Sequence, residues 1–139
     1  MKRAAIWSLA LSFILSAAVY ADDFVIIVNK ANPIGVISKQ DLKQVALGKK
    51  SEWKDGTKIY FVMQEGRGVH ETFVQEILHK NSAQYANYWK MAIFTGTGTP
   101  PRLLKSDEEV KNIVAGRKDA IGYISTSSLD SSVKRLNVQ

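Results

Sequence analysis

Short apolar runs alternate along the chain with stretches in which apolar residues recur every three or four positions. The run Phe24–Val28 is rich in β-branched residues and stops at Asn29 and Pro33, a pattern typical of a buried strand. Further runs predict strands at 58–63, 120–124 and 133–138. Between them, the spacing of apolar residues predicts four helices, at about 38–48, 69–78, 81–94 and 106–116.

The predicted helix ends carry their own signals. Ser38 and Ser106 precede two of the helices, each with an acidic residue three positions later, as in a capping box. Gly48 and Gly116 follow the same two helices, where glycine is favoured. Trp53 to Gly56 reads as a turn, with Trp53 expected to pack over the first helix. Strands separated by helices predict an α/β fold with a mostly parallel central sheet flanked by helices.

The first residues have the order of a secretory signal peptide. Met1-Lys2-Arg3 is basic, Ala4 to Ala18 is almost entirely apolar, and Val19-Tyr20-Ala21 ends in a small residue before the polar chain resumes. The apolar stretch is shorter than the roughly 20 residues that a membrane-spanning helix needs. We therefore expect cleavage after Ala21, a single domain over 22–139, a periplasmic location and no stable membrane insertion of the cleaved protein.

Composition narrows the function further. The chain has 139 residues, 19 Lys and Arg against 13 Asp and Glu, and no cysteine. The missing cysteines exclude disulfides, a thiolate nucleophile and a cysteine zinc site. The positive charge is scattered, and export argues against nucleic acid as a partner, so the charge fits an anionic small ligand or an acidic protein surface.

No catalytic or metal-binding pattern stands out. His70 and His79 are nine residues apart, which places them on opposite sides of one helix, and the simplest interpretation is two surface histidines. There is no nucleophile elbow and no complete phosphate loop. We therefore predict no enzyme activity, no cofactor and no metal. The helical spacing of Tyr85, Tyr88, Trp89 and Phe94 favours core packing over a ligand cage.

One loop has the character of an anion site. It runs from the strand at 58–63 into the start of the next helix, where free backbone N–H groups and the positive helix end attract anions. Its glycines allow a close approach of the backbone, and an arginine between them offers a charge-assisted bond. The alternative interpretation is a tight connection with a solvated arginine. The candidate ligand residues are Gly66, Arg67, Gly68, Val69 and His70.

Several motifs resemble those of the periplasmic phosphate-binding proteins of ABC transporters, and in particular of small members built from one lobe of that fold. They are Val28-Asn29-Lys30, Leu47-Gly48-Lys49, Trp53-x-Asp55-Gly56, Tyr88-Trp89, Phe94-x-Gly96-x-Gly98 and Ala120-Ile121-Gly122-Tyr123-Ile124. The resemblance covers most of residues 25–125. It implies a single type II binding-protein lobe, with phosphate or a similar anion as ligand and a membrane transporter or sensor as partner.

The phosphate loop of that family normally reads Gly-Ser-Gly-Thr-Thr. Here Gly66 and Gly68 keep the glycine places, Arg67 replaces the serine, and Val69 and His70 replace the threonines. A single lobe also leaves its anion site open to water, where ion pairs are weak. The chain is thus expected to be an exported single-lobe solute-binding protein that binds an oxyanion weakly. The alternative is an interaction module without a ligand that regulates an envelope or membrane protein.

Overall fold

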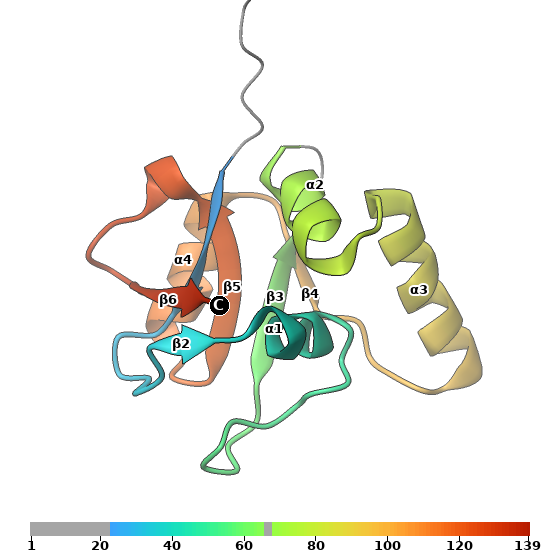
Figure 1. Cartoon of the computed structure of the whole chain (residues 1–139), viewed down its shortest axis with the longest axis horizontal. Helices are drawn as coiled ribbons and strands as arrows, with labels where there is room; N and C mark the ends of the chain where they lie inside the picture. Colours follow the sequence, from blue (N-terminus) through green and yellow to red (C-terminus); the bar gives the residue numbers. More distant parts are fainter. Residues whose placement is uncertain (1–22, 66–67) are drawn as a thin grey trace, which may run out of the picture.

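A six-stranded mixed sheet forms the centre of the computed structural model, which describes residues 23–65 and 68–139 (Figure 1). The strand order is β2-β6-β1-β5-β3-β4. Strands β5, β3 and β4 are parallel neighbours, and β2 is parallel to β6, whereas β1 runs antiparallel to both β5 and β6. The strands are β1 (Phe24–Val28), β2 (Val36–Ile37), β3 (Tyr60–Gln64), β4 (Arg102–Leu104), β5 (Ala120–Ser125) and β6 (Lys134–Val138).

The helices begin and end close to the predicted positions. They are α1 (Lys39–Ala46), α2 (Val69–Phe73), which continues into the π-helical turn η1 (Val74–Leu78), α3 (Ser82–Thr95) and α4 (Asp107–Gly116), with a short 3₁₀ turn η2 (Thr126–Ser128) after β5. Ser38 and Ser106 cap α1 and α4 as predicted, each hydroxyl accepting the backbone N–H three residues later. Among the residues described, no helix has the length and apolar content to cross a membrane.

The two faces of the sheet are covered unequally. Helices α1, α2 and α3, with the turn η1, pack on one face, and α4 alone covers the other. Alternate residues of β1 serve the two faces, because successive strand side chains point in opposite directions: Ile26 and Val28 face the three helices, and Val25 and Ile27 face α4. Gly122 in β5 lets α4 lie close to the sheet, since a Cβ there would come within 2.8 Å of Val110 Cγ1.

The predicted α/β lobe with its mostly parallel sheet is confirmed, and all four predicted strands are present. Trp53 is buried as expected, and Gly56 holds the turn with a φ of 84°. The prediction missed β2 and β4, which have only two and three residues. Segments this short carry no measurable hydrophobic period, so only their neighbours in the sheet define them.

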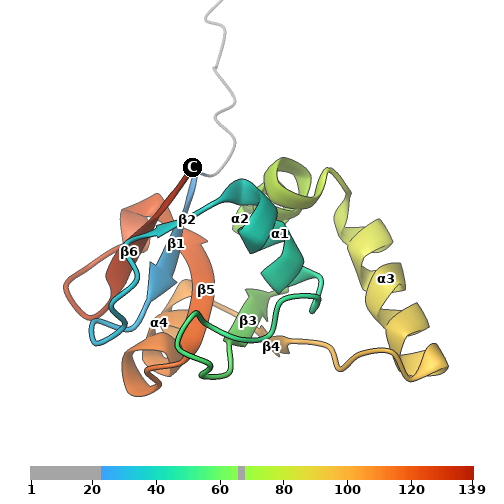
Figure 2. The ribbon, with the colours of Figure 1, turned by 60° about the horizontal axis from the view of Figure 1, so that its bottom comes forward.

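The end of α3 was predicted incorrectly. Tyr85 and Trp89 are buried as expected, but Ile93 is 60% exposed and Phe94 is 87% exposed. Figure 2 shows α3 standing apart at the margin of the molecule, joined to β4 by an extended segment. The last turn of α3 therefore has no neighbouring layer to pack against, and apolar residues there remain in contact with solvent.

Candidate functional site

The candidate site lies where the parallel strands β3, β4 and β5 end. Gln64 is the last residue of β3 and is paired with Leu104, the last residue of β4. In open α/β sheets, ligands bind beyond the carboxyl ends of the strands, so this edge is the natural place for a ligand. Of the predicted loop, Gly66 and Arg67 lie outside the described residues, whereas Gly68 immediately precedes α2.

The start of α2 differs from the other α-helix starts in the described residues. Its N-cap, Gly68, has a φ of 84° and provides no side-chain cap, whereas α1, α3 and α4 are capped by Ser38, Asn81 and Ser106. The N–H groups in the first turn of a helix have no partner within the helix. No side chain among the described residues accepts the backbone N–H groups that follow Gly68, so in the described structure they are available to an anion.

Val69 and His70 do not offer exposed side chains. Both are only 7% exposed, so Val69 can contribute to an anion site through its backbone alone. The expectation that His70 is a surface histidine is wrong, although His79 is exposed as predicted. His70 lies in an aromatic cluster, stacked on Tyr123 and about 6.2 Å from Tyr85 between ring centroids. These aromatic neighbours and the packing of α2 against β3 and β5 bury the ring.

A hydrogen-bond chain fixes the tautomer of His70. The Tyr123 hydroxyl accepts the backbone N–H of Gln64 at 2.9 Å and lies 2.5 Å from His70 Nδ1. We assign the hydroxyl proton to the bond with Nδ1, because it has no other acceptor among the described residues, and His70 then carries its own proton on Nε2. Burial lowers the pKa of His70, and the nearby Glu71 carboxylate opposes this only in part. His70 is thus a neutral hydrogen-bond donor at the site, not a cation.

A hollow of about 320 Å³ adjoins this histidine. Its walls are mostly apolar and come from His70, Tyr85, Trp89 and Leu103, with Lys90 at the margin. The Trp89 Nε1–H is buried and has no acceptor among the described residues, although buried indole N–H groups usually have one. One buried donor without an acceptor, the Trp89 Nε1–H, therefore belongs to a residue that lines this hollow.

A second network at the same edge was not predicted from the sequence. Asp107, the first residue of α4, accepts bonds from Gln64 Nε2 at 2.6 Å, Ser128 Oγ at 2.7 Å and the Ser125 N–H at 3.2 Å. Burial raises the pKa of the Asp107 carboxyl, but these bonds more than offset it, and the pKa lies below its ordinary value. From sequence, Asp107 reads only as an acidic residue in a helix first turn.

The site contains no arrangement suited to a metal ion. No group of three or more His, Asp or Glu side chains in the described part of the chain is placed to hold one. The chemistry available at the edge is hydrogen bonding by backbone N–H groups and by His70 Nε2, beside the already bonded carboxylate of Asp107 and the exposed carboxylate of Glu65. This combination can bind a small acceptor group, and it lacks a nucleophile with an adjacent base.

Comparison with known proteins places these features in a family. The model of the PBP superfamily domain matches residues 14–137. No curated protein matches the chain significantly. Solved structures with the same fold include an ABC-type phosphate transport receptor from Vibrio cholerae, with 23% identity and a TM-score of 0.69. A phosphate ABC transporter substrate-binding protein from Clostridium perfringens, solved with bound phosphate, has 25% identity to this chain and a TM-score of 0.68. PstS from Borrelia burgdorferi has 19% identity and a TM-score of 0.67.

The likeness spans most of this chain but only part of each receptor. The matches cover 84% of this chain for the Vibrio and Clostridium proteins and 85% for the Borrelia protein. They cover 46% of the Vibrio receptor, 45% of the Clostridium protein and 47% of the Borrelia protein. The chain thus spans about half the length of the solved relatives. With the sheet topology and the family match taken together, the chain belongs to the PBP superfamily.

Proposed function

We propose that this protein is an exported solute-binding lobe that binds phosphate or another small oxyanion weakly at the start of α2. The observation that carries the proposal is the uncapped first turn after Gly68, which lies at the carboxyl edge of β3 in a member of a solute-binding superfamily. The Clostridium relative holds phosphate, which supports an oxyanion as the class of ligand. The protein binds and releases its ligand without chemical conversion.

The proposed contacts are mostly backbone donors. Gly66, Gly68, Val69 and His70 supply N–H groups in the proposal, and Arg67 supplies the positive charge. The neutral His70 adds no charge, and the Asp107 carboxylate on the same edge opposes anion binding. With one wall of donors exposed to water, charge-assisted bonds are weakened. We expect a dissociation constant nearer to about 1 mM than to about 1 μM, a difference of about 4 kcal/mol.

The remaining parts of the proposal concern location and partner. Residues 1–21, which lie outside the described residues, have the features of a cleaved signal peptide, and this supports a periplasmic protein. The relatives are named as transport receptors, which supports a membrane transporter or sensor as the partner of this lobe. A lobe spanning half of such a receptor can reach tight binding only when a second surface closes its site.

The experiment is an NMR titration of the cleaved, isotope-labelled protein with phosphate, sulfate and acetate. The proposal expects saturable shifts of the amides of residues 68–71, with phosphate or sulfate stronger than acetate. Arg67→Gln should weaken binding and flatten its dependence on salt, because one formal charge is lost. Arg135→Gln removes an exposed arginine on β6 and serves as the matched control. Absence of shifts at tens of millimolar anion would refute the site and favour the interaction module without a ligand.

A further inference from the structure

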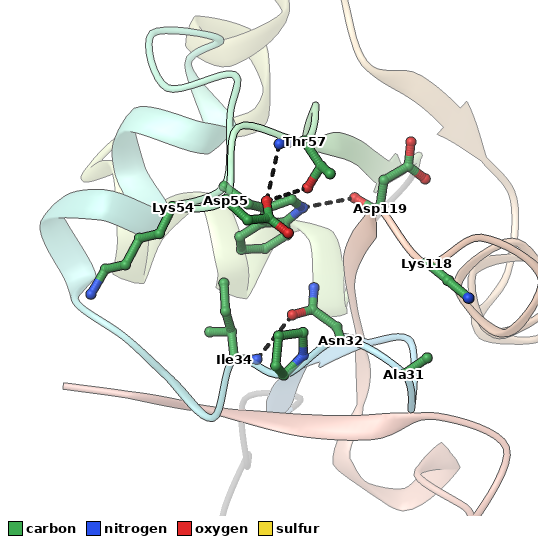
Figure 3. Close-up of a pocket in the computed structure, with 10 residues that line it drawn as sticks. Ala31, Asn32, Ile34, Lys54, Asp55, Thr57, Lys118 and Asp119 are labelled. Atoms are coloured by element: carbon green, nitrogen blue, oxygen red, sulfur yellow. Dashed lines mark hydrogen bonds between the residues drawn. The ribbon is translucent and has the colours of Figure 1, made fainter.

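A second hollow lies at the opposite end of the sheet from the proposed anion site (Figure 3). It has a volume of about 410 Å³ and is formed by three loops: residues 31–34 after β1, residues 53–57 before β3, and residues 118–119 before β5. Because β1 runs antiparallel to β5, its carboxyl end meets the amino ends of β3 and β5. The hollow is therefore separated from the start of α2 by the length of the sheet.

The walls of this hollow are rigid and largely apolar. Trp53 is 7% exposed, and its indole Nε1 donates to the backbone oxygen of Asp119 at 3.3 Å, which fixes the ring. Pro33 and Ile34 supply further apolar surface. Small-molecule sites usually have this volume and character, with a few polar groups placed among apolar walls. A flat apolar body is the shape that a tryptophan and a proline ring contact best.

One buried polar group points into the hollow without a partner. Asn32 is 5% exposed, and its Oδ1 accepts the backbone N–H of Ile34 at 3.0 Å. This bond fixes the side chain, and Figure 3 shows the amide nitrogen directed into the space between the loops. The Nδ2 group has no acceptor among the described residues. The Nδ2 atom is itself open to the hollow, so a hydrogen-bond acceptor on a ligand can take the place of water there.

The charged groups around the hollow are of both signs, with one cation in excess. Both carboxylate oxygens of Asp119 are held by Arg117, at 2.9 Å each, and Asp55 Oδ1 accepts the N–H and the hydroxyl of Thr57. Lys54 and Lys118 line opposite sides of the opening and form no ion pair in the part of the chain described. Their long side chains can turn toward a bound group. With Arg117 counted, three cations thus surround the hollow against two carboxylates, of which Asp119 is paired with Arg117 and Asp55 has no cationic partner among the described residues.

We propose that this hollow binds a small carboxylate with a flat apolar body. The carboxylate accepts from Asn32 Nδ2 and lies near the ammonium group of Lys118, while the apolar body packs against Trp53 and Pro33. Inorganic phosphate has no apolar part and does not satisfy these walls. The site is independent of the anion site at α2, because the two share no residue and no loop.

Three probes of one size test the ligand class: benzoate, its neutral amide benzamide, and the cation benzylamine. Each is titrated into the labelled, cleaved protein while the Trp53 indole and Asn32 side-chain amide resonances are followed. We expect benzoate to shift both resonances to saturation and to bind more tightly than benzamide, with no saturation by benzylamine. Equal binding of benzoate and benzamide, preference for benzylamine, or absence of shifts at these two groups would overturn the proposal.

Variants test the named contacts. Asn32→Asp keeps the acceptor for Ile34, removes the free donor and adds a negative charge that repels benzoate, so benzoate should bind at least about tenfold more weakly, whereas benzamide should lose less. Lys118→Gln should weaken benzoate about two- to fivefold, as expected for an exposed charge, whereas Lys30→Gln, an exposed lysine outside the hollow, should have no effect. Should Asn32→Asp not fold, the lysine pair decides alone: equal effects of the two changes would refute the site.

Discussion

Tyr123 connects the core to the candidate site, and Tyr123→Phe tests this connection. The ring is fully buried, stacked on Phe73 at 4.0 Å between centroids, and the substitution leaves this stacking in place. It removes one hydroxyl, which leaves the N–H of Gln64 and Nδ1 of His70 without their partners. A buried group left unpaired costs about 1–3 kcal/mol, so we expect a loss of about 2–4 kcal/mol in the free energy of unfolding.

Urea unfolding followed by circular dichroism measures this loss. Tyr60→Phe is the matched control, because Tyr60 is only partly buried and its hydroxyl forms no hydrogen bond among the described residues. The control should change the free energy of unfolding by less than about 0.5 kcal/mol. In parallel, nitrogen NMR should show the Nε2–H tautomer of His70 in the unaltered protein. A loss in Tyr123→Phe no larger than in the control, or the Nδ1–H tautomer, would refute the proposed hydrogen-bond chain.

Three further outcomes follow from the structure. Asp107→Asn should lower the free energy of unfolding, measured by urea titration, by about 1–3 kcal/mol. The reason is that the new amide N–H group faces one of the three donors that the carboxylate now accepts, and an unchanged value would contradict the network. Gly122→Ala should cost about 1–3 kcal/mol in the same assay, since its methyl group would overlap stiff valine side chains; a neutral result would show that α4 can move away. Because burial lowers the pKa of His70 from 6.5, stability should be complete above pH 6.5 and fall below it, where the unfolded chain takes up a proton first. His70→Gln should remove this loss of stability below pH 6.5, and His79→Gln should retain it.

The sequence predicts the fold well where the pattern is long. The segments Phe24–Val28 and Ala120–Ser125 are long enough to be recognised as strands. Each has five or six consecutive positions, whose side chains cover both faces of the sheet. Ser38 and Ser106 mark helix starts because each hydroxyl accepts the backbone N–H three residues later, in the first turn of its helix. Such signals depend on neighbours in the chain and are therefore readable without the tertiary structure.

The candidate site is less predictable, because its groups come from distant segments. His70 reads as a surface residue in a helix pattern, and its burial depends on Tyr123, which is 53 positions away. Asp107 and Gln64 are 43 positions apart and meet only because β3 and β4 are parallel neighbours. The exposed end of α3 illustrates the opposite error, since Phe94 follows the apolar pattern where no packing partner exists.

The network around Asp107 also bears on the strength of the proposed anion site. Polar groups at a partly buried edge need hydrogen-bond partners, and here they find them within the described residues. Gln64, Ser125 and Ser128 donate to Asp107, and the N–H of Thr126 donates to Asp23 at 3.0 Å beside the start of β1. These bonds use donors that would otherwise be available to an anion. The proposed anion site is therefore left with the backbone N–H groups in the first turn of α2, which is the reason we expect weak binding there.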